Sequence, residues 1–196
     1  MTIALETDAL DRIARARIVF GYLVARHALR GCDVGARVCV TGRLRVARRG
    51  GRIVVGRGAV FVGGLELTCL SAANAMIEIG EATVINSGAQ LAATGADVVL
   101  GRRCHLASKV RLLAEPGAPI FVGDDVMIAH NALIEGGVRI GSGSVIAAAA
   151  VVCGDVPPDS LAIGYPARSI SLALAPGADV AAARAESRLF SWTRAR

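Results

Sequence analysis

Several features that mark common classes of protein are scarce in this chain. Aromatic residues make up 4% of its 196 residues, and there are three histidines. The five cysteines are an odd number without C-x-x-C spacing, which argues against a disulfide framework or a zinc ribbon. No apolar run approaches the roughly 18 residues that span a bilayer, and the N-terminus lacks the layout of a signal peptide. The composition therefore predicts a cytoplasmic protein with reduced thiols.

The charge balance is basic, with a formal net charge of +6 and an isoelectric point near 9.6. Such a balance favours anionic partners, namely nucleotide phosphates, acidic glycans or lipid head groups. Nucleic acid is disfavoured as a partner, because the arginines are scattered and few aromatic residues are available to stack on bases. A soluble surface with surplus arginine is the alternative interpretation.

Hydrophobic residues, at 54%, and 23 glycines are abundant, and they are arranged in a short repeat. An aliphatic residue recurs every six positions, at Val122, Ile128, Ile134, Ile140, Ile146 and Val152. This period is neither the helical one of about 3.6 nor the alternation of a strand. Six-residue self-similarity is typical of hexapeptide-repeat parallel β-helices, in which each unit is a short strand and a turn. The sequence therefore predicts an all-β solenoid with stacked Val, Ile, Leu and Ala inside.

A longer repeat precedes this stretch. Glycines at positions 80, 101 and 123 follow similar aliphatic phrases, with spacings of 21 and 22 residues. Since three hexads make a coil of roughly eighteen residues, each of these coils should carry extra residues at one corner. Side chains one coil apart should stack in columns, and this stacking sets His105 beside Met127.

The chain divides into three predicted segments. Residues 1–31 form an N-terminal helical segment, whose helix over 8–30 has apolar residues at helical spacing and a basic edge. This helix either packs over the open end of the solenoid or docks on a membrane surface or a partner. Residues 32–171 form the β-helix domain, and residues 172–196 form a tail with a short helix over 178–190.

The hexads, closing with the phrase VVCGDVPPDSLAIGYPARSI, resemble the left-handed β-helix acyltransferases of the maltose, galactoside and xenobiotic acetyltransferase group. The resemblance covers residues 35–171. Pro157 and Pro158 should halt the repeat, since proline cannot donate to a ladder. The phrases GGRIVVG and VINSGAQL look more like the polysaccharide O-acetyltransferase branch. The resemblance implies a left-handed parallel β-helix, a homotrimer with acyl-CoA in clefts between subunits, and direct transfer to a hydroxyl or amine acceptor.

The resemblance also implies roles for individual residues. Asn86 matches an asparagine that lines the acceptor site, and Ala148 matches a small residue beside the pantetheine arm of acetyl-CoA. Arg168 matches the basic residue of the closing phrase. Met127 replaces the family's tryptophan, and Cys153 stands where a threonine precedes a lysine that contacts CoA. The expected cofactor-binding set is therefore Met127, Ala148, Cys153 and Arg168.

Acyl transfer needs a base that takes the acceptor proton, and histidine suits this because it titrates near neutrality. The family's catalytic histidine lies on a loop that is shortened here, with Glu115 in its place. We therefore expect His130, or His105 in its stead, to be the base. Glu115 is grouped with Asn86 on the acceptor side, where it could orient a histidine or act as base itself. His27 is expected to be an ordinary residue of an amphipathic helix.

These patterns predict an acyl-CoA-dependent O-acyltransferase that acetylates a sugar hydroxyl of a polysaccharide, glycolipid or glycosylated metabolite. The alternative is a catalytically degenerate trimeric scaffold, since the usual catalytic loop is missing. A zinc enzyme of the γ-carbonic anhydrase type is disfavoured, because its site needs three protein ligands and only His130, followed by Glu135, stands at such a spacing. No metal is expected. The expected partners are a second and third copy of the chain, a sugar-containing acceptor and, weakly, the inner face of a membrane.

Overall fold

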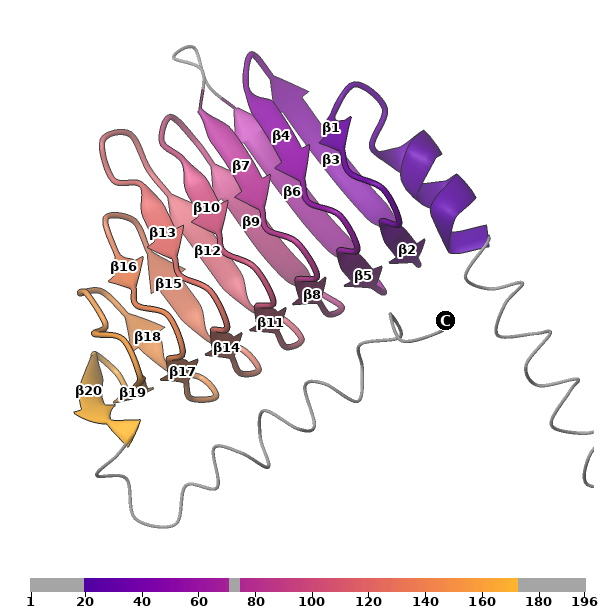
Figure 1. Cartoon of the computed structure of the whole chain (residues 1–196). Coiled ribbons are helices and arrows are strands. Elements are labelled where there is room, and N and C mark those ends of the chain that lie inside the picture. Colours follow the sequence, from indigo (N-terminus) through magenta and orange to yellow (C-terminus); the bar gives the residue numbers. More distant parts are fainter. Residues whose placement is uncertain (1–19, 71–74, 173–196) are drawn as a thin grey trace, which may run out of the picture.

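The computed structural model describes residues 20–70 and 75–172. These residues form a parallel β-helix whose coils stack along one axis, with a helix over residues 20–28 at the N-terminal end (Figure 1). The structure confirms the predicted left-handed β-helix and its N-terminal helix. The first part of that predicted helix, residues 8–19, and the predicted helix over 178–190 lie outside the described residues.

Each coil contributes one strand to each of three sheets, so the cross-section is a triangle. Sheet A comprises β1 (Asp33–Val34), β4 (Arg52–Val55), β7 (Met76–Ile79), β10 (Val98–Leu100), β13 (Ile120–Val122) and β16 (Arg139–Ile140). Sheet B comprises β2 (Cys39–Thr41), β5 (Val60–Val62), β8 (Val84–Ile85), β11 (His105–Leu106), β14 (Met127–Ile128), β17 (Val145–Ile146), β19 (Ser160–Gly164) and β20 (Ala167–Ser171). Sheet C comprises β3 (Leu44–Arg49), β6 (Leu65–Leu70), β9 (Ala89–Ala93), β12 (Arg111–Ala114), β15 (Leu133–Glu135) and β18 (Val151–Val152).

The core is a set of aliphatic columns, because alternate residues of a strand point to opposite faces of its sheet. The inner column of sheet B is made of Val40, Phe61, Ile85, Leu106, Ile128, Ile146 and Ala162, all of which are buried. The predicted series of aliphatic residues at six-residue spacing, from Val122 to Val152, lies in successive strands of the three sheets, and every member is buried. A six-residue spacing therefore places every repeat of the aliphatic residue inside, one per strand.

The turns between sheets are short and stack on one another. We call the segments that join sheet A to sheet B the A–B corner, and name the B–C and C–A corners in the same way. A residue in the left-handed conformation recurs at the A–B corner at Arg37, Ala82, Arg103, Asp125 and Asp159. The backbone amide of Asp125 donates to the carbonyl of Arg102 one coil away at 2.9 Å. Such bonds between coils offset the cost of a positive φ in residues that have a Cβ.

The close approach of successive coils explains the predicted glycine repeat. At Gly101 a Cβ atom would lie 2.5 Å from both the carbonyl carbon and the oxygen of Gly123, which belong to the backbone of the next coil. Real Cβ atoms do not approach backbone so closely, so only glycine fits this position.

The solenoid continues one strand beyond the predicted halt at Pro157 and Pro158. Strand β19 still pairs in parallel with β17, with Leu161 opposite Val145. The prolines lie between strands, at the corner that leads into β19, where their missing N–H groups leave the ladder intact. Strand β20 then turns back antiparallel to β19 and ends sheet B.

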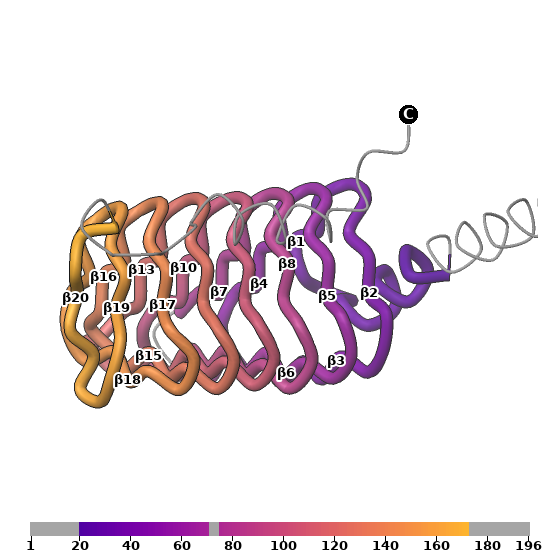
Figure 2. Tube along the Cα trace, turned by 90° about the horizontal axis from the view of Figure 1, so that it is seen from below, coloured from indigo at the N-terminus to yellow at the C-terminus, as the bar shows by residue number. Residues whose placement is uncertain are grey.

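The helix over residues 20–28 closes the other end, as Figure 2 shows. Ala25 and Leu29 are 2% exposed and belong to the core. Gly21 lies so close to Cys39 that a Cβ would collide with its sulfur atom. The interpretation of this helix as a cap over the open end is therefore confirmed. Within residues 20–70 and 75–172, the structure has no helix with the length and hydropathy to cross a membrane.

Candidate functional site

The B–C corner holds Asn86, His130 and Ala148, and His105 and Met127 lie in the strands of sheet B that lead into it. It consists of residues 86–88, 107–110, 129–132 and 147–150 in successive coils. Strand β11 pairs with β14 so that His105 lies opposite Met127, which confirms the predicted stacking of these two side chains. The other neighbour of His105 is Val84, in the strand that leads to Asn86.

His105 and Asn86 are joined side chain to side chain. The Nδ2 atom of Asn86 lies 2.8 Å from Nε2 of His105. Because an amide NH₂ group only donates, Nε2 accepts this hydrogen bond and the ring hydrogen sits on Nδ1. Among the described residues, Nδ1 of His105 is buried without a hydrogen-bond partner. The bond therefore presents the lone pair of Nε2 on the Asn86 side of the ring.

The pKa of His105 is lowered from its ordinary value of 6.5, first by burial and then by the charge of His130. The imidazolium form would also carry a hydrogen on Nε2, which would face the NH₂ group of Asn86 donor to donor. Neutral His105 is consequently the dominant form at pH 7. A neutral imidazole whose Nε2 lone pair accepts a hydrogen bond is the form that a general base requires.

His130 is held differently, at the exposed surface of the next coil. Its Nδ1 accepts a hydrogen bond of 3.2 Å from the backbone amide of Ser108. Since Nδ1 carries the lone pair in this bond, the neutral ring has its hydrogen on Nε2. His130 is therefore arranged as a hydrogen-bond donor at Nε2, whereas His105 is arranged as an acceptor.

The backbone amide of Ser108 has a role that the sequence could not indicate. Every residue except proline carries such an amide, so no residue type signals which one will face a histidine ring. The Oγ atom of Ser108 lies 3.5 Å from that of Ser87 in the preceding coil. The two serines continue the polar part of the B–C corner beside Asn86.

Two further predicted cofactor residues lie along the same corner. Ala148 is exposed one coil after His130, and the amide of its neighbour Ala149 donates to the carbonyl of His130 at 2.8 Å. Arg168 is exposed in β20, opposite Ile163 near the end of β19. Asn86, His105, Met127, His130, Ala148 and Arg168 thus follow one edge of the prism.

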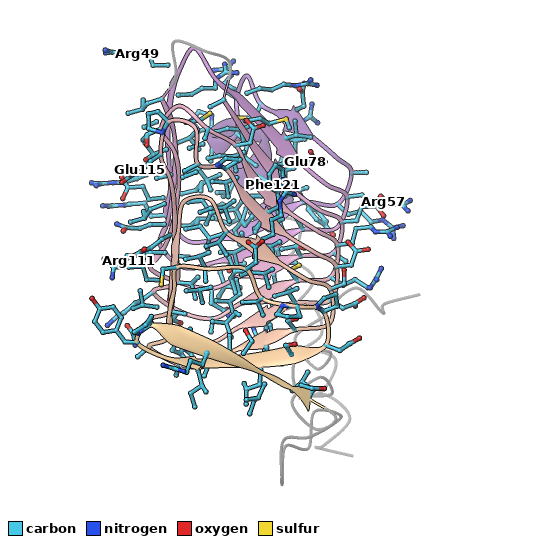
Figure 3. All side chains as sticks on the ribbon, turned by 90° about the vertical axis from the view of Figure 1, so that its left-hand side faces the viewer. Arg49, Arg57, Glu78, Arg111, Glu115 and Phe121 are labelled. Carbon is cyan, nitrogen blue, oxygen red and sulfur yellow. The ribbon has the colours of Figure 1, made fainter. Side chains whose placement is uncertain are left out.

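Glu115 and Cys153 lie at a different corner. Glu115 follows β12 in the C–A corner, where it is exposed and bridges to Ala118. Figure 3 shows Glu115 above Arg111, on the side of the loops that leave sheet C. Cys153 is exposed directly after β18, at the same corner two coils further on. Within one chain, neither residue reaches the Asn86–His105 pair.

No group of three or more His, Cys, Asp or Glu side chains in the described parts of the chain is arranged to hold a metal ion. The sequence spacing of His130 and Glu135 does not place them together, because His130 lies at the B–C corner and Glu135 ends β15 at the C–A corner. The described residues therefore do not provide the three-ligand set that a hydrolytic zinc site needs.

Comparison with known proteins agrees with the fold and indicates a class of enzyme. The family model for bacterial transferase hexapeptide (six repeats) matches residues 119–154. The 2,3,4,5-tetrahydropyridine-2,6-dicarboxylate N-acetyltransferase of Staphylococcus aureus is 41% identical over 81 residues, which cover 41% of this chain. The match spans 33% of that relative, so the chain corresponds to about a third of the relative's length.

Solved structures extend the similarity to most of the β-helix. A hexapeptide-repeat-containing acetyltransferase from Vibrio cholerae, complexed with acetyl coenzyme A, is 25% identical with a TM-score of 0.51, and the match covers 76% of this chain and 74% of that one. AntD, an N-acyltransferase from Bacillus cereus, in a variant complexed with dTDP and coenzyme A, is 16% identical with a TM-score of 0.64, covering 80% and 90%. At that identity AntD shows the fold alone. Together, these findings support the class of hexapeptide-repeat acyltransferases for this chain.

Proposed function

We propose that the protein is an acyl-CoA-dependent O-acyltransferase that transfers an acetyl group to a sugar hydroxyl, with His105 as the general base. The observation that supports this most directly is the hydrogen bond between Asn86 and the accepting Nε2 of a neutral His105. The acceptor would be a polysaccharide, a glycolipid or a glycosylated metabolite. The reaction would take place in the cytoplasm, where the five cysteines stay reduced.

In the proposed reaction, the acceptor hydroxyl takes the place of the Asn86 amide at Nε2 of His105. His105 removes the hydroxyl proton as the oxygen attacks the thioester carbonyl carbon, and Asn86 turns to hold the acceptor. The tetrahedral intermediate collapses, the C–S bond breaks, and the proton passes from His105 to the departing thiolate. One ester and one thiol are formed, and His105 returns to its neutral form.

His130 supplies a complementary group in this proposal. The carbonyl oxygen of the thioester gains negative charge in the transition state, and a fixed hydrogen-bond donor stabilises that charge. The Nε2 hydrogen of His130 is such a donor, because the Ser108 amide holds Nδ1 as the acceptor. The two histidines therefore divide the roles of base and oxyanion donor.

Acetyl-CoA would lie along the B–C corner from His105 towards Arg168. Four strand spacings separate β11 from β20, or about 19 Å at about 4.8 Å each. An extended pantetheine arm is of comparable length, so the CoA phosphates would come near the Arg168 guanidinium. Ala148 has only a methyl group to place beside the arm. A neighbouring copy in a homotrimer would close the groove from the other side.

Transfer to nitrogen is the second candidate, favoured by the curated N-acetyltransferases that the chain resembles. An amine acceptor reaches a site at neutral pH as an ammonium ion, which a nearby carboxylate would attract. Burial and His130 lower the pKa of His105, and no carboxylate of the described residues contributes to that shift. This surrounding suits an uncharged hydroxyl better than a cation.

The acid limb of the pH profile should reflect the lowered pKa of His105. The neutral form is active, so kcat/KM should fall with decreasing pH only when the pH passes through a value below 6.5. His105 binds a proton more readily in the unfolded chain than in the folded one. The free energy of unfolding is therefore unaffected by this group above pH 6.5 and decreases as the pH falls below that value. The measurement is kcat/KM against pH with an acceptor that does not titrate. An inflection at or above 6.5 would contradict the assignment.

Replacing His130 with alanine tests the division of roles. We expect kcat for acetyl-CoA turnover to fall by about 10²–10³, as for the loss of one oxyanion donor. The acid limb of kcat/KM should move to higher pH, because the charge of His130 no longer lowers the pKa of His105, but it should stay below 6.5 because burial still does. The assay follows release of free thiol with a panel of sugar acceptors, and amine analogues are the control for transfer to nitrogen. If no acceptor supports turnover by the wild-type protein, the degenerate scaffold replaces the enzyme as the better account.

A further inference from the structure

The N-terminal end of the β-helix carries most of the surplus charge. Nine arginines lie between residues 20 and 70, against two carboxylates, Asp33 and Glu66. Glu66 lies opposite Arg45 in the next coil and accepts a hydrogen bond from Gln90 at 3.3 Å. Asp33 pairs with Arg52 at 2.7 Å, and Arg57 lies 3.8 Å from Glu81 of the next coil. No carboxylate within the described residues pairs with the other seven, which are all exposed: Arg26, Arg30, Arg37, Arg43, Arg45, Arg48 and Arg49. In Figure 3, Arg49 and Arg57 project outward on opposite sides of the prism.

The rest of the solenoid is close to neutral and slightly acidic. Residues 75–172 carry nine carboxylates against six lysines and arginines. Several of these form ion pairs between coils, such as Arg102 with Asp124 at 2.7 Å and Arg103 with Asp125 at 2.6 Å. The positive charge is thus concentrated at one end, and the arginines are not scattered evenly as the sequence had suggested.

The capping helix adds large apolar side chains to this end. Its inner face buries Ala25 and Leu29, whereas Phe20 is 68% exposed and Leu23 is 62% exposed on the opposite face. At helical spacing, Leu23 shares that outer face with Arg26, and with Arg30 just beyond the helix. Exposed aromatic and aliphatic side chains interleaved with arginine are typical of helices that lie in the interface of a membrane.

We propose that this end of the β-helix docks on a membrane surface that contains anionic phospholipids. We call it the basic end, meaning the outer face of the helix over 20–28 and the exposed arginines of the first coil. The arginines would lie among the lipid phosphates, while Phe20 and Leu23 enter the boundary between head groups and acyl chains. A soluble polyanion would use the arginines but leave both apolar side chains in water, so the membrane accounts for more of the surface.

The docked orientation follows from the shape. The coils stack away from the helix (Figure 1), so the axis of the prism would stand upright on the membrane. Strand β11 is three strand spacings from β2, or about 14 Å at about 4.8 Å each. The helix over 20–28 lies between β2 and the lipid, so His105 would stand farther from the membrane than this distance. The docking itself does not depend on the proposed acyl transfer.

Vesicle co-sedimentation of the full chain tests the proposal. We expect binding to vesicles of phosphatidylcholine with added phosphatidylglycerol, no binding to phosphatidylcholine alone, and weaker binding as salt rises. Neutralising one arginine near the surface should weaken binding about fivefold, so R26Q with R30Q should weaken it roughly 25-fold. The matched control is R111Q, which removes an exposed arginine in the middle of sheet C and should change binding less than twofold.

A second double variant distinguishes a membrane from a soluble polyanion as the binding partner. Replacing Phe20 and Leu23 with serine should weaken vesicle binding several-fold while leaving the salt dependence unchanged, because the charges remain. Equal binding by this double variant and the wild type would show a site for polyanions only, and would overturn the proposal. Equal binding by R26Q with R30Q, or binding to phosphatidylcholine alone, would overturn it as well. Circular dichroism of each variant confirms that the β-helix is retained.

Discussion

Replacing His105 with glutamine should lower kcat for acetyl transfer by about 10²–10⁴, the range that a positioned general base contributes. The glutamine amide cannot accept a proton near neutral pH, although it can still hydrogen-bond to Asn86. The loss should therefore appear in kcat, with a smaller change in KM for acetyl-CoA, and the acid limb of the pH profile should disappear. Steady-state kinetics with a sugar acceptor measure both quantities.

His27 provides the matched control for this substitution. It is a solvent-exposed histidine on the helix over 20–28, far along the axis from β11. We expect H27Q to keep the wild-type kcat and pH profile. Wild-type turnover by H105Q would remove His105 from the chemistry. A fall in kcat of similar size in H27Q would show that the assay reports a general loss of active protein and not the loss of the base.

The largest expected effect on stability comes from Gly101→Ala. The added Cβ would meet the carbonyl group of Gly123 at 2.5 Å, and backbone cannot move aside as a flexible side chain does. Overpacking of this kind costs about 3 kcal/mol, which corresponds to a fall in Tm of roughly 6–12 °C for a chain of this size. Thermal unfolding followed by circular dichroism is the measurement. We expect the Tm of Gly101→Ala to be lower than that of the wild type by this amount.

Gly64→Ala is the matched control for the same change of residue. A Cβ at Gly64 would have no heavy atom within 4 Å, and its φ is not in the left-handed region. We expect its Tm to stay within about 2 °C of the wild type, since exposed substitutions change stability by about 0.5 kcal/mol or less. If the two variants had equal Tm values, the close stacking of the coils at the A–B corner would not be a source of stability.

The fold could be predicted from the sequence because its signal is periodic. The aliphatic residues at positions such as Ile128, Ile134 and Ile140 lie one per strand and are all buried. The extra residues between Gly101 and Gly123 lengthen a corner and leave the strands in register, so the stacking of His105 on Met127 could also be predicted. Pro157 and Pro158 misled the prediction, because a proline ends a ladder only where its N–H is needed.

The site was less predictable, because its geometry depends on rotamers and backbone amides. The predicted stacking of His105 on Met127 places His105 near His130, which follows Met127 by three residues. It could not indicate that Asn86 would bond to Nε2 of His105, or that the Ser108 amide would face Nδ1 of His130. Those two contacts assign opposite hydrogen-bonding roles to two identical residue types. Likewise, sequence alone grouped Glu115 with Asn86, whereas the fold puts them at different corners.

The antiparallel turn of β20 also bears on self-association. A stack of parallel coils exposes open strand edges at both ends, and such edges favour end-to-end growth into fibres. Here the helix over 20–28 covers the first coil, and β20 presents a strand of reversed direction on which another first coil cannot continue the winding. Continuation of sheet B is therefore blocked at β20, and the helix shields the first coil at the other end.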